Sequence, residues 1–384
     1  MIIRVNSVEE LRNPVNRCRA AVNKGDGVNA LQACMLFEAT TDGLTGRLSI
    51  TALDQRSHQL TLCIPDGVVD VQEPGVALVP HDFLPDVLNK LPASEAITLE
   101  VDTNGKMVVK CNHDIFDVFL HQGNPDDFRI AMVTEDQLPE QVCSVNGSSL
   151  TQLIADSIPI ISDQEDFKLV GEGTVLHAFA HDRNSSIVSH VAVEAQDQSE
   201  DWSVSLVSKL PKLINKYWLD TVSIHLKLAD NTSGPMLAFK CNHDYFVVRQ
   251  LMTDIDVSML QDALAKDKVG SFIVDGALLK NKAKMLDLAK SDINIEVAKN
   301  TLRFYSSYAS RGNNDVKVIL DSMDDSQPQE KFLRDLLKRA IGALDVAKVQ
   351  GEWVPFDEEG TNHFLRLVDA DLPEFKQVLV TPIQ

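Results

Sequence analysis

The sequence has no uninterrupted apolar run of roughly 18 residues, so it predicts no membrane-spanning helix. The first residues, MIIRVNSVEELRN, do not show the basic and then apolar layout of a secretory signal, and we expect no such leader. No phosphate-binding loop, dinucleotide-binding glycine fingerprint or Ser-His-Asp pattern is present. We therefore expect a protein without a catalytic centre and without a cofactor.

Cysteine is scarce, and no two cysteines have the CxxC spacing of zinc ribbons and redox sites. The six cysteines are widely separated: Cys18, Cys34, Cys63, Cys111, Cys143 and Cys241. This distribution is typical of free thiols in a reducing compartment. It predicts a cytoplasmic protein without a disulfide framework.

Basic residues are outnumbered, with 36 Lys and Arg against 56 Asp and Glu and a formal net charge of −20. A uniformly acidic surface would repel phosphates, so composition alone argues against nucleic-acid binding. Net charge does not say where the bases lie, however, and a basic surface can exist on an acidic protein. The positions of Lys and Arg along the chain therefore decide this question.

Two segments share their first five residues: KCNHDIFDVFL begins at Lys110 and KCNHDYFVVRQL at Lys240. In an extended strand, Cys and the His two positions later lie on one face and could supply two metal ligands, but zinc needs about four. A tight turn is the other interpretation, because Asn, His and Asp stand between β-rich runs. We favour the turn. The alternative is a metal-binding protein that uses Cys111, His113, Cys241 and His243.

The 130 residues between the two KCNHD copies have the length of a domain, and other features recur at a similar spacing. The helical pattern LVPHDFLPDVLNKL begins at Leu78, and LVSKLPKLINKYWL begins at Leu206. A strand ending in Val and followed by Asn or Asp, a good N-cap, opens RVNSVEEL, SVNGSSL and IVDGALL. These repeats predict three homologous domains, at residues 1–135, 136–265 and 266–384.

Each predicted domain runs strand, helix, several strands, helix and strand hairpin. Hairpin-linked strands predict antiparallel sheets with helices grouped on one face, which is an α+β arrangement. The third repeat has Phe375 in the place of Phe116 and Phe246, but it reads VDADLPEF where the others have KCNHD. A metal site that one repeat in three lacks is less plausible than a shared turn.

Several segments resemble the bacterial β sliding clamp, the processivity ring of the replicative DNA polymerase. These are LSITALDQRSHQLTLCI with Asp54 at its turn, VLHAFAHDRNSSIVSHVAV with Asp182, and VLVTPIQ with Pro382. The resemblance covers nearly the whole chain. The second domain has fewer residues before its turn at Asp182 than the first has before Asp54. The third domain differs most from the family, especially in DSMDDSQPQEK. These differences are typical of a distant member of the family, for example one encoded by a phage.

The resemblance implies three clamp domains with antiparallel sheets outside and helices lining a central pore. Two copies would join head to tail into a homodimeric ring around double-stranded DNA, with contacts to phosphates rather than to base sequence. The ring would do no chemistry. It would tether a DNA polymerase, a clamp loader and other clamp-motif proteins, so that rebinding becomes intramolecular.

Helices that line a pore around DNA should be basic even in an acidic chain. The predicted helices at 207–219, 277–290 and 331–345 are rich in Lys and Arg, as is the first helix, whereas those at 81–91 and 148–162 are not. The expected DNA-binding residues are Arg12, Arg17, Arg19, Lys24, Lys209, Lys212, Lys216, Lys280, Lys282, Lys284, Lys331, Arg334, Lys338 and Arg339. The alternative is that these side chains only solvate exposed helix faces.

The resemblance also implies a cleft between domains 2 and 3 that takes a short partner peptide with hydrophobic anchors. The matching positions are His181, Ile187, Met259, Leu260, Leu379, Thr381, Pro382 and Ile383. The ring interface would involve Phe116, Val118 and Leu288. A clamp-like scaffold that recruits repair or transcription factors would share these features, and a generic three-domain interaction protein would share the exposed lysines.

Overall fold

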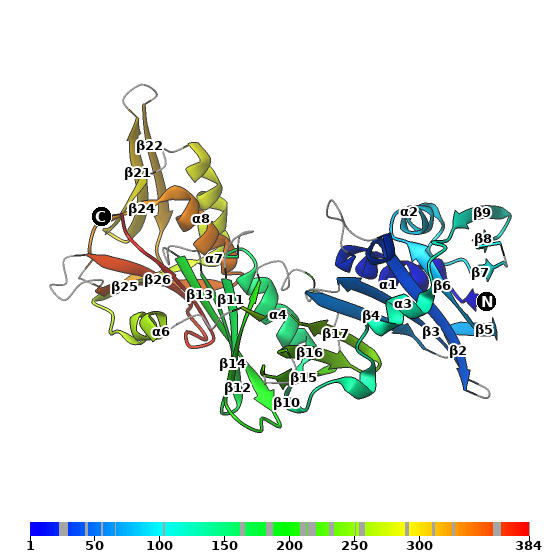
Figure 1. Cartoon of the computed structure of the whole chain (residues 1–384). Helices are drawn as coiled ribbons and strands as arrows, with labels where there is room; N and C mark the ends of the chain where they lie inside the picture. The colour runs from blue at the N-terminus through cyan, green and yellow to red at the C-terminus, as the bar shows by residue number, and fades with distance from the viewer. Residues whose placement is uncertain are drawn as a thin grey trace. The chain divides into compact units, whose positions relative to one another are not determined.

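The computed structural model places the chain in two compact units (Figure 1). Unit 1 comprises Met1–Val142 and Val222–Leu251, and unit 2 comprises Cys143–Thr221 and Met252–Gln384. The structure describes residues 1–22, 30–42, 45–54, 57–65, 67–102, 104–161, 166–181, 187–207, 213, 220–229, 234–249, 251–252, 258–288, 292–308, 312–324, 327–355 and 362–383. Within these residues, no helix is long and apolar enough to cross a membrane.

Unit 1 contains two antiparallel sheets. The first has the order β5 (Val69–Glu73), β1 (Ile2–Val5), β7 (Ile97–Val101), β8 (Lys106–Cys111) and β9 (Asp114–Phe119). The second has the order β6 (Gly75–Pro80), β2 (Cys34–Asp42), β3 (Thr45–Asp54), β4 (His58–Ile64), β17 (Asp244–Val248), β16 (Met236–Cys241) and β15 (Thr221–Lys227). The β4–β17 pair therefore joins strands that are far apart in the sequence.

Unit 2 also contains two antiparallel sheets. The larger has the order β14 (Trp202–Val207), β11 (Asp166–Glu172), β12 (Val175–His181), β13 (Ile187–Gln196), β27 (Lys376–Val380), β26 (His363–Asp369), β25 (Lys348–Pro355), β19 (Gly270–Asp275) and β23 (Ser322–Met323). The smaller has the order β22 (Gly312–Ile319), β21 (Thr301–Tyr308), β20 (Asp292–Ala298) and β24 (Glu330–Leu333). Strand β10 (Gln141–Asn146) pairs with the end of β13, and β18 (Leu251–Met252) is short.

The helices are short and lie between these strands. They are α1 (Val8–Ala21), α2 (Phe83–Lys90), α3 (Pro125–Ile130), α4 (Gly147–Ser157), α6 (Ser258–Ala265), α7 (Gly276–Ala283) and α8 (Arg334–Ala343). In the described ranges, 3-10 turns accompany them at η1 (Ala30–Ala33), η2 (Glu135–Gln137) and η3 (Lys284–Leu288). Helix α1 contacts β3 and β4, α4 contacts β12 and β13, and α8 contacts β24 and β27. Antiparallel sheets backed by helices confirm the α+β prediction.

Side-chain caps explain where the repeated helices begin. Asn146 accepts from the amide of Ser148 (2.9 Å), and Asp275 accepts from the amide of Leu278 (2.7 Å), as the sequence predicts. In the first repeat the prediction is wrong by one residue: Ser7 caps α1, and Asn6 instead donates to the carbonyl of Gly67 (2.7 Å). The Ser7 hydroxyl, and not the Asn6 side chain, caps the helix because Ser7 is the residue directly before α1.

Other helix predictions need correction or lie outside the described residues. Lys331, expected on a helix, lies in strand β24, because α8 begins only at Arg334. The helix expected over 277–290 ends at Ala283 and continues as the 3-10 turn η3. Most of the helix expected at 207–219 lies outside the residues that the structure describes. The three domain boundaries stay a prediction.

Candidate functional site

The two KCNHD segments form the turns that the sequence predicts. Cys111 pairs with Asp114 and Cys241 with Asp244, which leaves two-residue turns in which Asn112 and Asn242 have φ of 52° and 55°. Asn tolerates this left-handed conformation better than most residues. Both cysteines are buried while both histidines are exposed, so the Cys and His side chains do not converge. Among the described residues, no group of three or more His, Cys, Asp and Glu could hold a metal.

The second turn is tied to its surroundings far more than the first. Asp244 accepts from the amide of Cys63 (2.7 Å), and the Cys63 thiol donates to the carbonyl of His243 (3.3 Å). Glu135 pairs with Lys240 (2.9 Å) and with His243 (3.3 Å). Burial raises the pKa of the Asp244 carboxyl, against the opposing effects of the Cys63 amide and of the Arg17 charge. These hydrogen bonds connect the turn before β17 to Cys63 of β4.

Two strand pairs join equivalent elements of successive repeats. In unit 1, β17 pairs with β4, with Tyr245 opposite Thr61. In unit 2, β27 pairs with β13, with Val380 opposite Ile187. By the repeat order, β9 corresponds to β17 and β27, and β22 corresponds to β4 and β13. In the described part of the chain, β9 and β22 stand at the ends of their sheets.

Both end strands expose large apolar side chains. On β9, Ile115 is 65% exposed and Phe119 is 77% exposed, and on β22, Ile319 is 72% exposed. The predicted interface residue Val118 is 1% exposed, Phe116 is half-buried, and the Leu288 side chain lies outside what the structure describes. Strand alternation alone does not say which face points inward, so the sequence did not single out Ile115 and Phe119, and the ring-interface residues stay a prediction. The exposed apolar face belongs to Ile115 and Phe119.

Two of the expected DNA-binding cations of α1, Arg12 and Arg19, contact α2. Arg12 donates to the carbonyls of Leu88 (2.9 Å) and Leu91 (2.7 Å) at the end of that helix, which supplies donors to its unpaired carbonyls. Arg19 pairs with Asp86 (2.8 Å). Arg17 is half-buried. Four further expected residues lie outside the described part: Lys24, Lys209, Lys212 and Lys216.

The cations of α7, η3 and α8 lie close to acidic partners. Lys280 pairs with Asp345 (2.6 Å), and this lysine lowers the pKa of the Asp345 carboxyl. Lys338 pairs with Asp287 of η3. One ion pair links α7 to the residue Asp345 beyond the end of α8, and the other links α8 to η3, so part of the positive charge of these elements is neutralised.

The remaining expected cations have different surroundings. Lys282 is half-buried, and Lys284 is exposed and donates to the side chain of Asn281 (3.3 Å). In the strand β24, Lys331 pairs with Asp292 (2.9 Å). Arg334 pairs with Asp335 (2.8 Å), whereas Arg339 donates to the carbonyls of Pro159 (3.2 Å) and Ile160.

Part of the expected partner site forms an apolar cluster on the large sheet of unit 2. Leu379 packs with Phe179 and Val188, and Val170, Leu264 and Phe364 pack around them. Ile187 begins β13 and is fully buried. The sequence did not single out Leu264 or Phe364, because nothing local shows that α6 and β26 lie against β27.

Other expected residues of the partner site lie near this cluster or are only partly described. His181 is buried at the end of β12, where its backbone pairs with Val188. Pro382 is buried, Thr381 and Ile383 are half-buried, and the Ile383 amide donates to the carbonyl of Lys331 (2.7 Å). Met259 and Leu260 belong to α6, but their side chains lie outside what the structure describes.

Two histidines extend the cluster along β12 and β13. The Nδ1 of His177 and the Nε2 of His190 are 3.0 Å apart, so one of them donates a hydrogen bond to the other. The rings of Phe179 and His190 stack, with centroids 4.8 Å apart. Burial, and then the charge of His177, lowers the pKa of His190 to about 4. Burial also lowers the pKa of His177.

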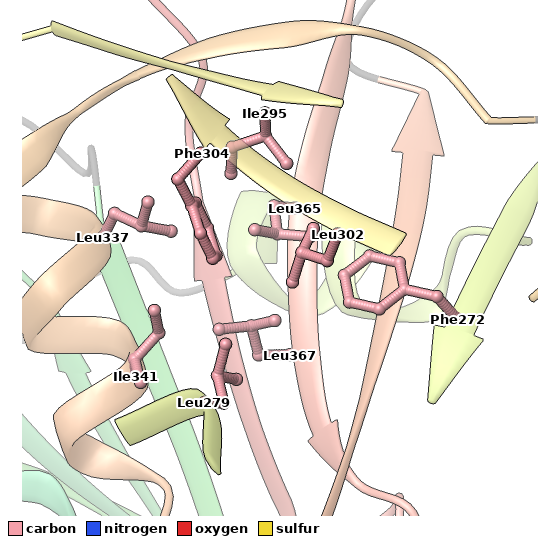
Figure 2. Close-up of a pocket in the computed structure, with 9 residues that line it drawn as sticks. All are labelled: Phe272, Leu279, Ile295, Leu302, Phe304, Leu337, Ile341, Leu365 and Leu367. Atoms are coloured by element: carbon pink, nitrogen blue, oxygen red, sulfur yellow. The ribbon is translucent and has the colours of Figure 1, made fainter. Parts of the chain in front are cut away.

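A separate small cavity lies in the core between the smaller sheet of unit 2, α7, α8 and β26 (Figure 2). Its lining is entirely apolar, with Phe304, Leu337 and Leu367 among the side chains that point into it. Its volume of about 10 Å³ is at the lower limit for one water molecule. We interpret it as a packing defect of the core rather than a ligand site.

Comparisons with known proteins identify the fold. No protein-family model matches the chain, and no curated protein matches it in sequence. Among solved structures, it is similar to the β subunit of DNA polymerase from Streptococcus pyogenes (TM-score 0.81, 16% identity, 100% of both chains). It is also similar to the sliding clamp from Pseudomonas aeruginosa bound to griselimycin (TM-score 0.80, 18% identity, 100% of this chain and 99% of that one).

The DNA polymerase sliding clamp from Bacillus subtilis is a third similar structure, with a TM-score of 0.79, 16% identity and coverage of 100% and 99% of the two chains. The likeness extends over the full length of all three. It agrees with the sequence repeats, with the α+β sheets and with the strand joints described above. The chain therefore has the fold of the bacterial DNA polymerase III β subunit, the sliding clamp, as the sequence resemblance indicates.

Proposed function

We propose that this protein is a sliding clamp that encircles double-stranded DNA, does no chemistry itself and tethers a DNA polymerase and other replication proteins in the cytoplasm. The observation that carries the proposal is the pattern of strand joints in a chain with the clamp fold. Two joints are made within the chain, β4–β17 and β13–β27. The equivalent strands β9 and β22 stand at sheet ends with exposed apolar side chains.

This pattern supports head-to-tail closure. If β22 of one copy pairs with β9 of the next, the third joint repeats the geometry of the other two. Such a contact is heterologous, and it gives a closed ring when the rotation between copies closes. We propose a ring of two copies, with Ile115, Phe119 and Ile319 in each contact.

The proposed DNA contact lies on the helices. Lys280, Lys282 and Lys284 follow one another along α7 and η3 in a chain of net charge −20. Contacts of lysine to phosphate carry no base sequence and weaken with salt, so the ring could slide. The nearby Asp287 and Asp345 compete with phosphate for Lys338 and Lys280, which keeps each contact weak.

The proposed partner site is the apolar cluster of Phe179, Val188 and Leu379, with α6 beside it. Large apolar side chains of a peptide are the anchors that such a cluster would accept. The Pseudomonas aeruginosa clamp was solved with griselimycin. We propose that griselimycin binds this cluster in the present chain, and we use it as the probe. We expect Leu264→Lys to abolish griselimycin binding measured by calorimetry, and Leu372→Lys, an exposed leucine elsewhere in unit 2, to leave it unchanged.

The solution mass and the small-angle scattering shape test the ring. We expect a solution mass of about 85 kDa, twice the 42.5 kDa of the chain, and a scattering profile that fits a ring with a central hole. A monomer at every concentration would contradict the proposal.

DNA binding is tested with Lys280→Glu/Lys282→Glu/Lys284→Glu. The slope of log affinity against log salt should fall by roughly 0.9 for each phosphate that the variant no longer neutralises. The matched control is Arg4→Glu/Lys299→Glu/Lys348→Glu, which changes three exposed basic residues on strands and a turn, away from the helices and from β9 and β22, and should leave the slope unchanged.

A further inference from the structure

Helix α6 forms one side of the proposed partner site although it has only eight residues. Its Leu264 packs on the cluster of Phe179, Val188 and Leu379. A helix of two turns has little stability of its own, so its place on the sheet must come from tertiary contacts. The question is which contacts hold it there.

Arg366 of β26 supplies such contacts at the C-terminal end of α6. Its guanidinium Nη1 donates to the carbonyl of Lys266 (3.2 Å) and to that of Leu264. The last carbonyls of a helix lack partners within the helix, and a cation there is favoured by the helix dipole. A single side chain therefore caps α6 and attaches it to the sheet.

Glu352 of β25 fixes the direction of the Arg366 side chain. The Arg366 Nε donates to a Glu352 oxygen (2.6 Å), and both side chains are buried, with 11% and 9% exposed. The second Glu352 oxygen accepts from Gln350 (2.6 Å) and pairs with Lys268 (3.3 Å). Three donors thus engage the two oxygens of the carboxylate, which holds the guanidinium fork in one orientation.

The register of the sheet links this pair to the partner cluster. Arg366 stands opposite Glu352 on one side and opposite Leu379 on the other. The same side chain therefore lies between the buried acid and the apolar cluster, and it reaches to the helix that covers the cluster. A buried ion pair contributes little net stability compared with apolar residues, but it specifies geometry when every hydrogen bond is made.

We propose that Arg366, oriented by Glu352, is the positioning residue of the partner site: it fixes α6 so that Leu264 forms a wall of the apolar cluster. This inference rests on the proposed partner site. Arg366 need not touch the partner, because it acts through α6.

The test uses the full-length protein and the variant Arg366→Met/Glu352→Gln, which removes the ion pair without leaving a buried unpaired charge. Two quantities are measured: hydrogen exchange of the amides in 258–265, and griselimycin affinity by calorimetry. We expect exchange in α6 to accelerate at least tenfold and affinity to fall at least tenfold, while salt-dependent DNA binding is unchanged. Arg366→Lys keeps the charge but not the fork, and it should give intermediate values for both.

The matched control is Arg303→Met/Glu296→Gln, which removes another Arg–Glu pair (3.1 Å) from the smaller sheet of the same unit. It should change neither quantity. Unchanged exchange in α6, or faster exchange with wild-type affinity, would overturn the role of Arg366. Failure of the wild-type protein to bind griselimycin would instead contradict the proposed partner site, and the inference with it.

Discussion

The two KCNHD turns of unit 1 have the same residues and nearly the same backbone, yet they differ in what lies beside them. In the first, Asp114 is exposed and the strand that follows, β9, stands at the end of its sheet. In the second, Asp244 is held by the Cys63 amide, and β17 is paired along its length with β4. The two turns have the same first five residues, so the difference in their contacts comes from the neighbouring strand β4, which lies beside the second turn.

The largest expected effect is on assembly, and it comes from changes to β9, the strand at the end of its sheet. Ile115→Glu/Phe119→Glu places two charges on the exposed face of β9, where pairing with another copy would have to bury them. We expect the solution mass to fall from about 85 kDa to that of the single 42.5 kDa chain. Ile130→Glu, at a residue 83% exposed on α3, is the control and should keep the larger mass. Assembly unaffected by the β9 change would show that this strand is not the interface.

The turns themselves can be compared by one substitution made twice. Asp244→Ala leaves the Cys63 amide without its acceptor at the β4–β17 joint, and we expect a loss of about 1–3 kcal/mol in the free energy of unfolding of unit 1. Asp114→Ala removes an exposed carboxyl and should cost less than about 0.5 kcal/mol. Urea unfolding of both variants measures the difference. Equal losses would mean that the joint does not depend on the turn.

The two closed joints should respond to pH in opposite directions. His190, at the β13–β27 joint, has a pKa lowered to about 4 by burial, whereas an unfolded histidine titrates near 6.5. As the pH falls below about 6.5, the histidine takes up a proton in the unfolded chain before it does so in the folded one. The free energy of unfolding of unit 2 should therefore fall by about 1–2 kcal/mol between pH 7 and pH 5. His190→Gln should flatten that dependence.

At the β4–β17 joint, burial raises the pKa of Asp244 instead. The contribution of Asp244 to stability is therefore present at low pH and falls as pH rises from the ordinary aspartate range through the raised pKa. Hydrogen exchange of β17 and β27 amides across pH would separate the two joints. A common pH profile would contradict the distinction.

The smallest effects are expected from the lysines that open the two turns. Lys110 pairs with Glu100 (2.6 Å) and Lys240 with Glu135 (2.9 Å), and all four side chains are between 30% and 42% exposed. Exposed ion pairs contribute roughly 0–1 kcal/mol, so Lys110→Met and Lys240→Met should each lower the free energy of unfolding by less than about 1 kcal/mol. Thermal unfolding in low and high salt would check both. A large loss at Lys240 alone would mean that the Glu135 contact, not Asp244, secures the joint.

The repeats in the sequence predicted the fold because they combine several local signals. The turn residues of KCNHD, the caps at Asn146 and Asp275, and the strand and helix periods all act within a few positions. The spacing of these signals then indicated the order of the elements. Such information is local, and the long-range arrangement came with the resemblance to a known fold.

The candidate sites were harder to predict because they depend on which strands become neighbours. Lys331 sits in a short strand beside Asp292, and no pattern within 330–333 distinguishes that strand from the start of α8. The contribution of Leu264 and the reach of Arg366 to α6 depend on contacts across about 100 residues. The same limit explains why the sequence did not single out Ile115 and Phe119 on β9.

The β4–β17 joint has a consequence for how the chain is made. Unit 1 consists of residues 1–142 and 222–251, so its last strands leave the ribosome only after about 80 residues of unit 2. Until then β4 has an open edge, and contacts of such large sequence separation form slowly. We therefore expect the two units to fold in an interleaved order, and a nascent chain paused between residues 142 and 244 to expose the edge of β4 for longest.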